Sequence, residues 1–165
     1  LIADEPTTAL DVTIQARILN LIAELQQRLG TSVLYISHDL SLVREISDRV
    51  AVMYAGRIVE IGRTEDLFRE PLHPYTRSLM SAIPSSTSTR GRLAAIEGNV
   101  PELIDPQPSC RFHSRCPHAL EICRNFDPRF LRHDVDHGVA CHGHDDPADL
   151  GFPTSEVPTV GSMSR

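Results

Sequence analysis

The sequence changes character near residue 84, and this change limits what the chain can fold into. Before that point, apolar residues recur with clear periods. After it come all four cysteines and six of the eight histidines, and eleven of the twelve prolines lie at or beyond position 71. A break of this kind within 165 residues predicts a periodic domain followed by a small Cys- and His-rich module.

Strands and helices alternate in the first part, as is typical of an α/β sheet. Apolar runs over 1–3 and 32–36 predict strands, and apolar residues at steps of three and four predict a helix over 12–29 between them. We expect Asp11 to cap this helix and Gly30 to end it. The remaining expected elements are a short helix over 40–47, a hairpin of 50–54 and 57–61 around Ala55-Gly56, a helix over 65–70 capped by Thr64, and a helix from Pro74 to about Ile83.

Composition sets the expected borders and excludes several functions. We expect a partial α/β domain over 1–83, a linker over 84–92, a Cys-rich module over 93–145 and a disordered tail over 146–165. The net charge of −6 gives no reason to expect nucleic acid. The chain holds no lysine, which excludes a lysine-dependent phosphate site within it. It has neither a signal-peptide pattern nor an apolar run of the roughly 18–20 residues that a membrane span requires.

Polar residues follow two of the predicted strands directly. Asp4-Glu5 comes after the first strand and His38-Asp39 after the second. Because working residues in such sheets gather at the carboxyl ends of strands, these groups predict one site. There the first acid can hold Mg²⁺ and the second can orient an attacking water. The alternative is that the acids only cap a strand in solvent.

Longer motifs around these residues favour the site. Leu-Ile-Ala-Asp-Glu-Pro-Thr-Thr-Ala-Leu-Asp (1–11) resembles the Walker B segment and D-loop of ABC-transporter ATPases. His38, within Tyr-Ile-Ser-His-Asp-Leu, resembles their switch histidine, and residues 52–62 resemble the hairpin that follows it. The resemblance implies an ATP- and Mg²⁺-dependent ATPase with an α/β fold.

The resemblance also implies a role for each matching residue. Asp4 is implied to be the acid that holds Mg²⁺ through water, Glu5 the catalytic carboxylate, and His38 the contact to the γ-phosphate. Ala9, Leu10 and Asp11 are implied to form the D-loop, which communicates across a dimer of nucleotide-binding domains. The Walker A loop, the Q-loop glutamine and the Ser-Gly-Gly signature of the family do not occur in this sequence. We therefore expect the C-terminal part of a longer subunit, inactive as an ATPase by itself.

A second set of motifs is more selective. His73-Pro74-Tyr75, Gly98-Asn-Val-Pro101 and the segment from Cys110 to Ala119 resemble landmarks of the oligopeptide/dipeptide importer ATPases. This resemblance runs from about residue 71 to 142. It implies a peptide importer, although nickel importers share the architecture. The implied partners are a second ABC ATPase subunit, two transmembrane permeases and, indirectly, an extracytoplasmic peptide-binding protein. The implied location is the cytoplasmic face of the membrane.

The four cysteines need a physical account of their own. Cys110, Cys116, Cys123 and Cys141 are separated by five, six and seventeen residues. Disulfides are disfavoured because the resemblance implies a cytosolic ATPase half, and the cytosol keeps thiols reduced. Structural zinc sites use shorter gaps within each ligand pair, so the spacing favours an iron–sulfur cluster over zinc. The family resemblance points the same way, since some relatives carry a [4Fe–4S] cluster here. Free thiols remain an alternative, and a non-catalytic regulatory fragment that binds a metal or an iron–sulfur cluster remains the alternative function.

Overall fold

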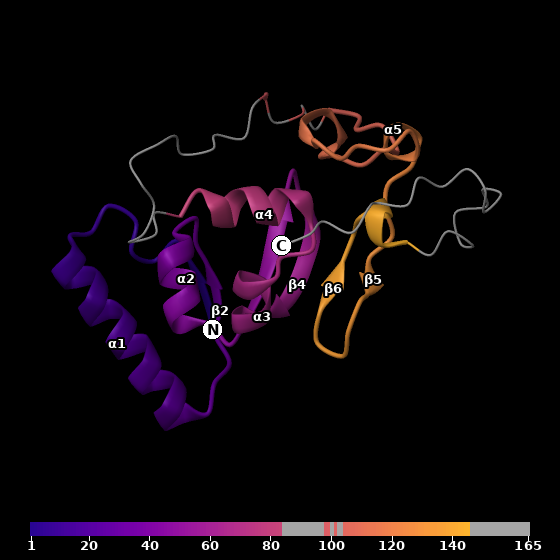
Figure 1. Cartoon of the computed structure of the whole chain (residues 1–165). Coiled ribbons are helices and arrows are strands. Elements are labelled where there is room, and N and C mark those ends of the chain that lie inside the picture. The colour runs from indigo at the N-terminus through magenta and orange to yellow at the C-terminus, as the bar shows by residue number, and fades with distance from the viewer. Residues whose placement is uncertain (84–97, 100, 102–103, 146–165) are drawn as a thin grey trace. The chain divides into compact units, whose positions relative to one another are not determined.

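The computed structural model describes residues 1–83, 98–99, 101 and 104–145 (Figure 1). The expected linker over 84–92 and the expected disordered tail over 146–165 lie outside these residues. The chain divides into two compact units, Leu1–Ser47 and Asp48–Arg165, which are considered separately below. In the described residues, no helix is long and apolar enough to cross a membrane.

The first unit is a strand–helix–strand–helix segment. It contains β1 (Ile2–Asp4), α1 (Val12–Leu29), β2 (Leu34–Ile36) and α2 (Leu40–Ile46). β1 and β2 pair in parallel, with Ala3 opposite Tyr35, which confirms the predicted α/β character. A parallel pair needs a crossover connection, and α1 supplies it. The carboxyl ends of both strands therefore lie at the same edge of the sheet.

Local signals fix the ends of α1 where the sequence predicts them. The Asp11 carboxylate accepts a hydrogen bond from the Ile14 amide at 2.9 Å, which satisfies one of the free donors of the first turn. Gly30 ends the helix with φ of 61°, a left-handed conformation that glycine adopts without strain. Both predicted caps of α1 are confirmed.

The apolar face of α1 stays largely uncovered within the described chain. None of the helix residues is buried, and Leu21 and Leu29 are more than half exposed. Ile2 and Leu34 on the two strands are exposed as well. An apolar face of this extent is typical of a surface that another segment or chain covers.

The second unit combines the hairpin with the Cys-rich segment. Its elements are β3 (Arg49–Tyr54), β4 (Arg57–Arg63), α3 (Thr64–Arg69), α4 (Pro74–Ser81), the 3-10 turn η1 (His113–Arg115), α5 (Ile122–Asn125), β5 (Leu131–Arg132), β6 (Gly138–Val139) and the 3-10 turn η2 (His142–His144). Within the described ranges they form one antiparallel sheet in the order β3-β4-β6-β5. The register places Glu60 of β4 opposite Val139 of β6. The Cys-rich segment thus adds strands to the hairpin sheet, which composition alone does not predict.

Two predicted helix ends in this unit differ from the structure. Arg63 is the N-cap of α3 and makes no side-chain capping bond, while Thr64 is the first residue of the helix. The prediction that Thr64 caps α3 was therefore wrong, because the helix begins directly at the end of β4. Pro74 occupies the first turn of α4 as predicted, but its helix ends at Ser81, two residues before the expected end. The hairpin turn is confirmed, since Ala55 and Gly56 have φ of 47° and 77°, the positive pair that tight hairpins require.

Aromatic rings join the Cys-rich segment to the hairpin. Phe112 is 2% exposed, and its ring centroid lies 5.1 Å from that of Tyr54 and 5.5 Å from that of Tyr75. The Tyr54 and Tyr75 rings are 4.6 Å apart. Arg111 also donates a hydrogen bond to the carbonyl of Ala55 in the hairpin turn. Phe112, two residues after Cys110, is therefore part of the core that the hairpin forms.

Candidate functional site

The first candidate site lies where β1 and β2 end, and it brings Glu5 and His38 together as predicted. The His38 Nδ1 atom is 2.9 Å from Glu5 Oε1, and Thr8 Oγ1 donates to Glu5 Oε2 at 2.7 Å. The Glu5 amide donates to the Ile36 carbonyl at 2.9 Å, which extends the strand pairing by one residue. Glu5 has φ of 42°, a left-handed conformation that non-glycine residues seldom adopt and that often marks functional turns.

The electrostatics of this pair suit a carboxylate base. Hydrogen bonds from His38 and then Thr8 lower the pKa of Glu5, so it is ionised at neutral pH. The hydrogen bond to Glu5 and the negative charge of Glu5 raise the pKa of His38. Both side chains are open to solvent, at 42% and 76% exposure. The ionised Glu5 can accept a hydrogen bond from a water, and the neighbouring His38, which gains a proton readily, can donate one to a phosphate oxygen.

The other predicted residues of this site lie on the same turn. Asp4 is the last residue of β1 and is exposed. Ala9 has φ of 65°, and Leu10, which is 41% exposed, donates its amide to the Thr7 carbonyl. The Asp11 carboxylate is engaged as the cap of α1. These positions give the D-loop residues a fixed local conformation, and their predicted role across a dimer stays a prediction.

The second candidate site is a cavity of about 240 Å³ in the second unit. All four cysteines line it, and all four are free thiols. Five histidines and Arg77 also line it, and among its described lining residues there is no carboxylate. The four cysteines that the sequence pattern groups together therefore do line one cavity in the structure. In the described part of the chain, no three His, Cys, Asp or Glu side chains lie close enough together to hold a metal ion.

Burial keeps the cysteines protonated in this arrangement. It raises the pKa of Cys110 to about 11 and that of Cys141 to about 12, and it raises the pKa of Cys116 and Cys123 as well. Backbone hydrogen bonds act in the opposite direction at each thiol, as from Phe112 to Cys110. Amide donors aimed at sulfur stabilise thiolates and their metal complexes. A metal that replaces the thiol protons would release these protons to solvent.

One histidine of this cavity has both ring nitrogens engaged. His142 Nδ1 is 2.6 Å from Asp145 Oδ2, and its Nε2 is 3.1 Å from the Phe126 carbonyl. Both partners are acceptors, so they fix the orientation of the ring from its two sides. The sequence predicts the histidines near the cysteines to lie in solvent or around the ligands. The structure buries His142, which is 7% exposed and has a hydrogen-bond partner at each ring nitrogen.

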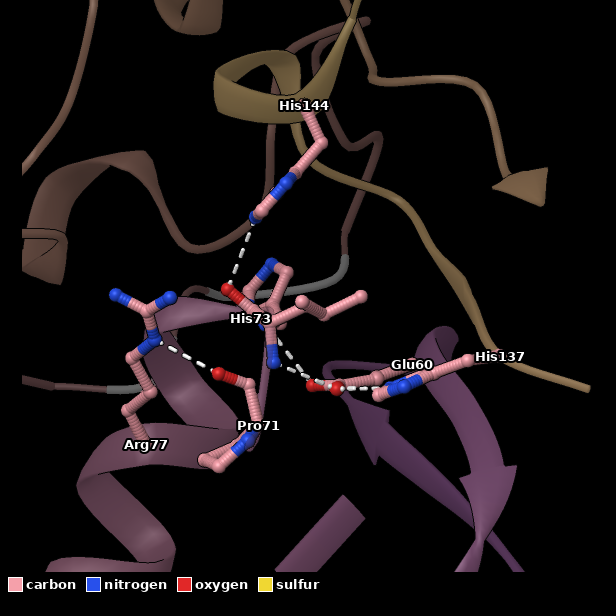
Figure 2. Close-up of polar contacts among 7 residues, drawn as sticks. Glu60, Pro71, His73, Arg77, His137 and His144 are labelled. Atoms are coloured by element: carbon pink, nitrogen blue, oxygen red, sulfur yellow. Dashed lines mark hydrogen bonds and ion pairs between the residues drawn. The ribbon is translucent and has the colours of Figure 1, made fainter. Parts of the chain in front are cut away.

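Sequence reasoning missed a buried carboxylate at the edge of this site (Figure 2). Glu60 is fully buried in β4. Its Oε1 accepts hydrogen bonds from the Leu72 amide and from His137 Nε2, both at 2.7 Å, and its Oε2 accepts one from the His73 amide at 2.9 Å. The available signal was an acid within the apolar run from Ile58 to Ile61, directly between Val59 and Ile61.

Comparison with known proteins identifies the family. Residues 59–123 match the family described as "Oligopeptide/dipeptide transporter, C-terminal region". A probable peptide ABC transporter ATP-binding protein of Sinorhizobium fredii is 53% identical over 142 residues, 86% of this chain and 42% of that protein. The chain belongs to the family of peptide ABC transporter ATP-binding proteins.

Two further relatives agree. A dipeptide transport ATP-binding protein of Haemophilus influenzae is 49% identical over 86% of this chain and 43% of its own length. An oligopeptide transport ATP-binding protein of Bacillus subtilis is 50% identical over the same shares. The chain spans less than half the length of these peptide ABC transporter ATP-binding proteins. The matched region from 59 to 123 contains Glu60, the His-Pro-Tyr segment and three of the four cysteines, but not Cys141.

Proposed function

We propose that the chain is the C-terminal part of the ATP-hydrolysing subunit of a di- or oligopeptide importer. The observation that carries this proposal is the Glu5–His38 pair at the carboxyl ends of two parallel strands. The names of the relatives support peptide over nickel as the cargo. The subunit would act at the cytoplasmic face of the membrane, with a second ABC ATPase subunit, two permeases and an extracytoplasmic peptide-binding protein.

The residues of the pair have separable tasks in ATP hydrolysis. Glu5, ionised and held by Thr8 and His38, accepts a hydrogen bond from the attacking water and orients it. His38, with its raised pKa, donates to an oxygen of the terminal phosphate. Asp4 would hold Mg²⁺ through water, and the bound ATP and Mg²⁺ would supply the reacting phosphate and its charge compensation. Ala9, Leu10 and Asp11 would carry the signal between two such domains.

The ATPase proposal has two tests. The 165-residue chain should release no phosphate from ATP, and steady release that Glu5→Gln abolishes would contradict the expected inactivity. A chimera that joins the chain to the upstream half of the Sinorhizobium fredii relative should hydrolyse ATP. In the chimera, Glu5→Gln should lower kcat by about 100-fold or more while ATP binding persists. Glu24→Gln, an exposed acid of α1, is the matched control. Equal rates for the two variants would refute the role of Glu5.

We further propose that Cys110, Cys116, Cys123 and Cys141 hold a [4Fe–4S] cluster, with zinc as the alternative. Four thiols that line one cavity, each with a backbone hydrogen bond, are the type of donor that such a cluster requires, and binding would have to draw them closer together than they lie in the structure. The absence of carboxylates from the described lining, and the presence of Arg77, suit the negative charge of a thiolate-ligated group. Such a group would supply cross-linking of the module and, if exposed, redox chemistry.

Metal analysis distinguishes the two cofactors. Protein purified without oxygen should contain iron and acid-labile sulfide and should be brown. Colourless protein with one zinc per chain would eliminate the cluster. If the purified protein keeps four reactive thiols and contains neither iron nor zinc, the cysteines are structural. The non-catalytic alternative function would then have no cofactor.

A further inference from the structure

The four cysteines reach their cavity from two different parts of the second unit. Cys110, Cys116 and Cys123 lie on one short segment, and the Cys110 amide donates to the Cys123 carbonyl at 2.9 Å, which closes that segment on itself. Cys141 comes from elsewhere, two residues after the end of β6. The position of Cys141 relative to the other three therefore depends on whatever holds β6.

β6 is only two residues long, so it has few hydrogen bonds of its own. It pairs with β4 at Val139 opposite Glu60, and the Ala140 amide donates to the Val59 carbonyl at 2.8 Å. At the other end of β6, His137 donates to the Glu60 carboxylate at 2.7 Å. Both ends of the strand that leads to Cys141 are thus attached to residues 59 and 60 of β4.

The same carboxylate also holds two residues that line the cavity. Leu72 and His73 line the cavity, and both donate their amides to Glu60 (Figure 2). The Leu72 carbonyl in turn accepts a hydrogen bond from His144 Nε2 at 3.2 Å, three residues beyond Cys141. One buried side chain therefore connects two segments, around residues 72–73 and residue 137, that are far apart in the sequence.

We propose that Glu60 is a positioning residue of the four-cysteine cavity, and that its carboxylate sets where Cys141 stands relative to the other three cysteines. An ionised carboxylate is an acceptor only, so its two oxygens satisfy all three donors. A glutamine of the same size carries an N–H₂ group in place of one oxygen. This N–H₂ group would face at least one of the Leu72, His73 and His137 donors, so that hydrogen bond would be lost. The segment that the bond holds would then be free to move.

Thiol alkylation of the reduced, metal-free chain tests this inference site by site. Iodoacetamide modification followed by mass spectrometry gives one rate for each cysteine. Glu60→Gln should raise the rate at Cys141 by about tenfold or more, which is the effect of losing one buried hydrogen bond on a local opening equilibrium. The rates at Cys110, Cys116 and Cys123 should stay within about twofold, because these three share a separately closed segment. Glu65→Gln, an exposed acid of α3, is the matched control and should change no rate.

A second variant keeps the test decisive if Glu60→Gln does not fold. His137→Ala removes only the arm that leads to Cys141 and should raise the Cys141 rate alone. If either variant accelerates all four cysteines equally, in step with a lower melting temperature, Glu60 merely stabilises the fold and the inference is wrong. An unchanged Cys141 rate in both variants would also overturn it.

A role for Glu60 in cofactor binding rests on the proposed cofactor site. Reconstitution with iron and sulfide, or with zinc, tests the cofactor proposal separately from the role of Glu60. If the wild-type chain takes up neither iron and sulfide nor zinc, the cofactor proposal fails while the thiol rates still decide the role of Glu60. If the wild type assembles a cluster, Glu60→Gln should lower the cluster content per chain and change its absorption spectrum. A cluster of equal content, spectrum and potential in both proteins would refute the positioning role.

Discussion

Truncating Phe112 to alanine tests whether the Cys-rich segment and the hairpin form one core. Phe112 is among the largest fully buried side chains of the described residues, and its ring contacts those of Tyr54, Tyr75 and His73. Removal of a buried phenylalanine costs about 3–5 kcal/mol, because the transfer free energy is lost and a cavity remains. Small domains are stable by only about 5–15 kcal/mol, so this one change removes a large share of the total.

Urea denaturation measures the effect. Tyrosine fluorescence in a Tyr35→Phe background reports on the second unit, because the other two tyrosines are the buried Tyr54 and the half-buried Tyr75, whose ring packs on that of Tyr54. With a urea dependence of about 2 kcal/mol per M, the expected loss lowers the unfolding midpoint by about 2 M. Phe126→Ala, at a position that is 61% exposed, should shift it by less than about 0.3 M. Equal shifts for the two variants, or a Phe112→Ala shift below about 0.5 M, would refute a shared core.

Three further predictions follow from single sites. Burial lowers the pKa of His73 to about 4, so the unfolded chain binds a proton near pH 6 that the folded chain does not bind. The free energy of unfolding should therefore fall by up to about 3 kcal/mol as the pH drops from about 6.5 to 4. His73→Asn, which can still accept from the Tyr75 amide, should flatten this decline of the urea midpoint, and an unchanged decline would argue against the burial of His73. Asp11→Ala should destabilise α1 by about 1 kcal/mol while Asp11→Asn should not, as followed by circular dichroism during thermal unfolding; equal melting curves would exclude the cap. Because burial raises the pKa of Cys141 to about 12, iodoacetamide should modify Cys141 more slowly than Cys116 at pH 8 in the metal-free chain, and the reverse order would contradict the described cavity.

The elements that local chemistry determines could be predicted from the sequence. The apolar periodicity of α1, together with Asp11 and Gly30 at its ends, predicted its bounds without error. Ala55-Gly56 predicted the hairpin turn because Gly56 adopts a positive φ without strain, whereas Ala55 takes its φ of 47° against the usual preference of alanine. The Glu5–His38 pair could be predicted because parallel strands bring their carboxyl ends to one edge.

The parts that depend on distant contacts could not be predicted. β5 and β6 are two residues long, and so short a segment shows no periodicity that favours a strand. For the same reason nothing in the sequence indicates that Glu60 meets His137. The domain borders drawn from composition stay predictions. In the structure, contacts group the hairpin with the described part of the Cys-rich segment, because Phe112 packs on Tyr54.

The pairing of β4 with β6 has a consequence for the order of events during synthesis. The 77 residues from Glu60 to His137 take about 4–15 s to be made at 5–20 residues per second. Throughout that interval β4 presents a strand edge with no partner from the region of β6. A charged side chain on such an edge discourages pairing with other chains.

Glu60 would thus disfavour pairing of this edge with other chains until it becomes the buried acceptor of His137. Chains that end at residue 123 should stay soluble with Glu60 and aggregate with Glu60→Leu. The apolar substitution would thus have an effect on aggregation while residues 61–137 are still being made, before the loss of the hydrogen bonds to Leu72, His73 and His137 is felt in the finished sheet.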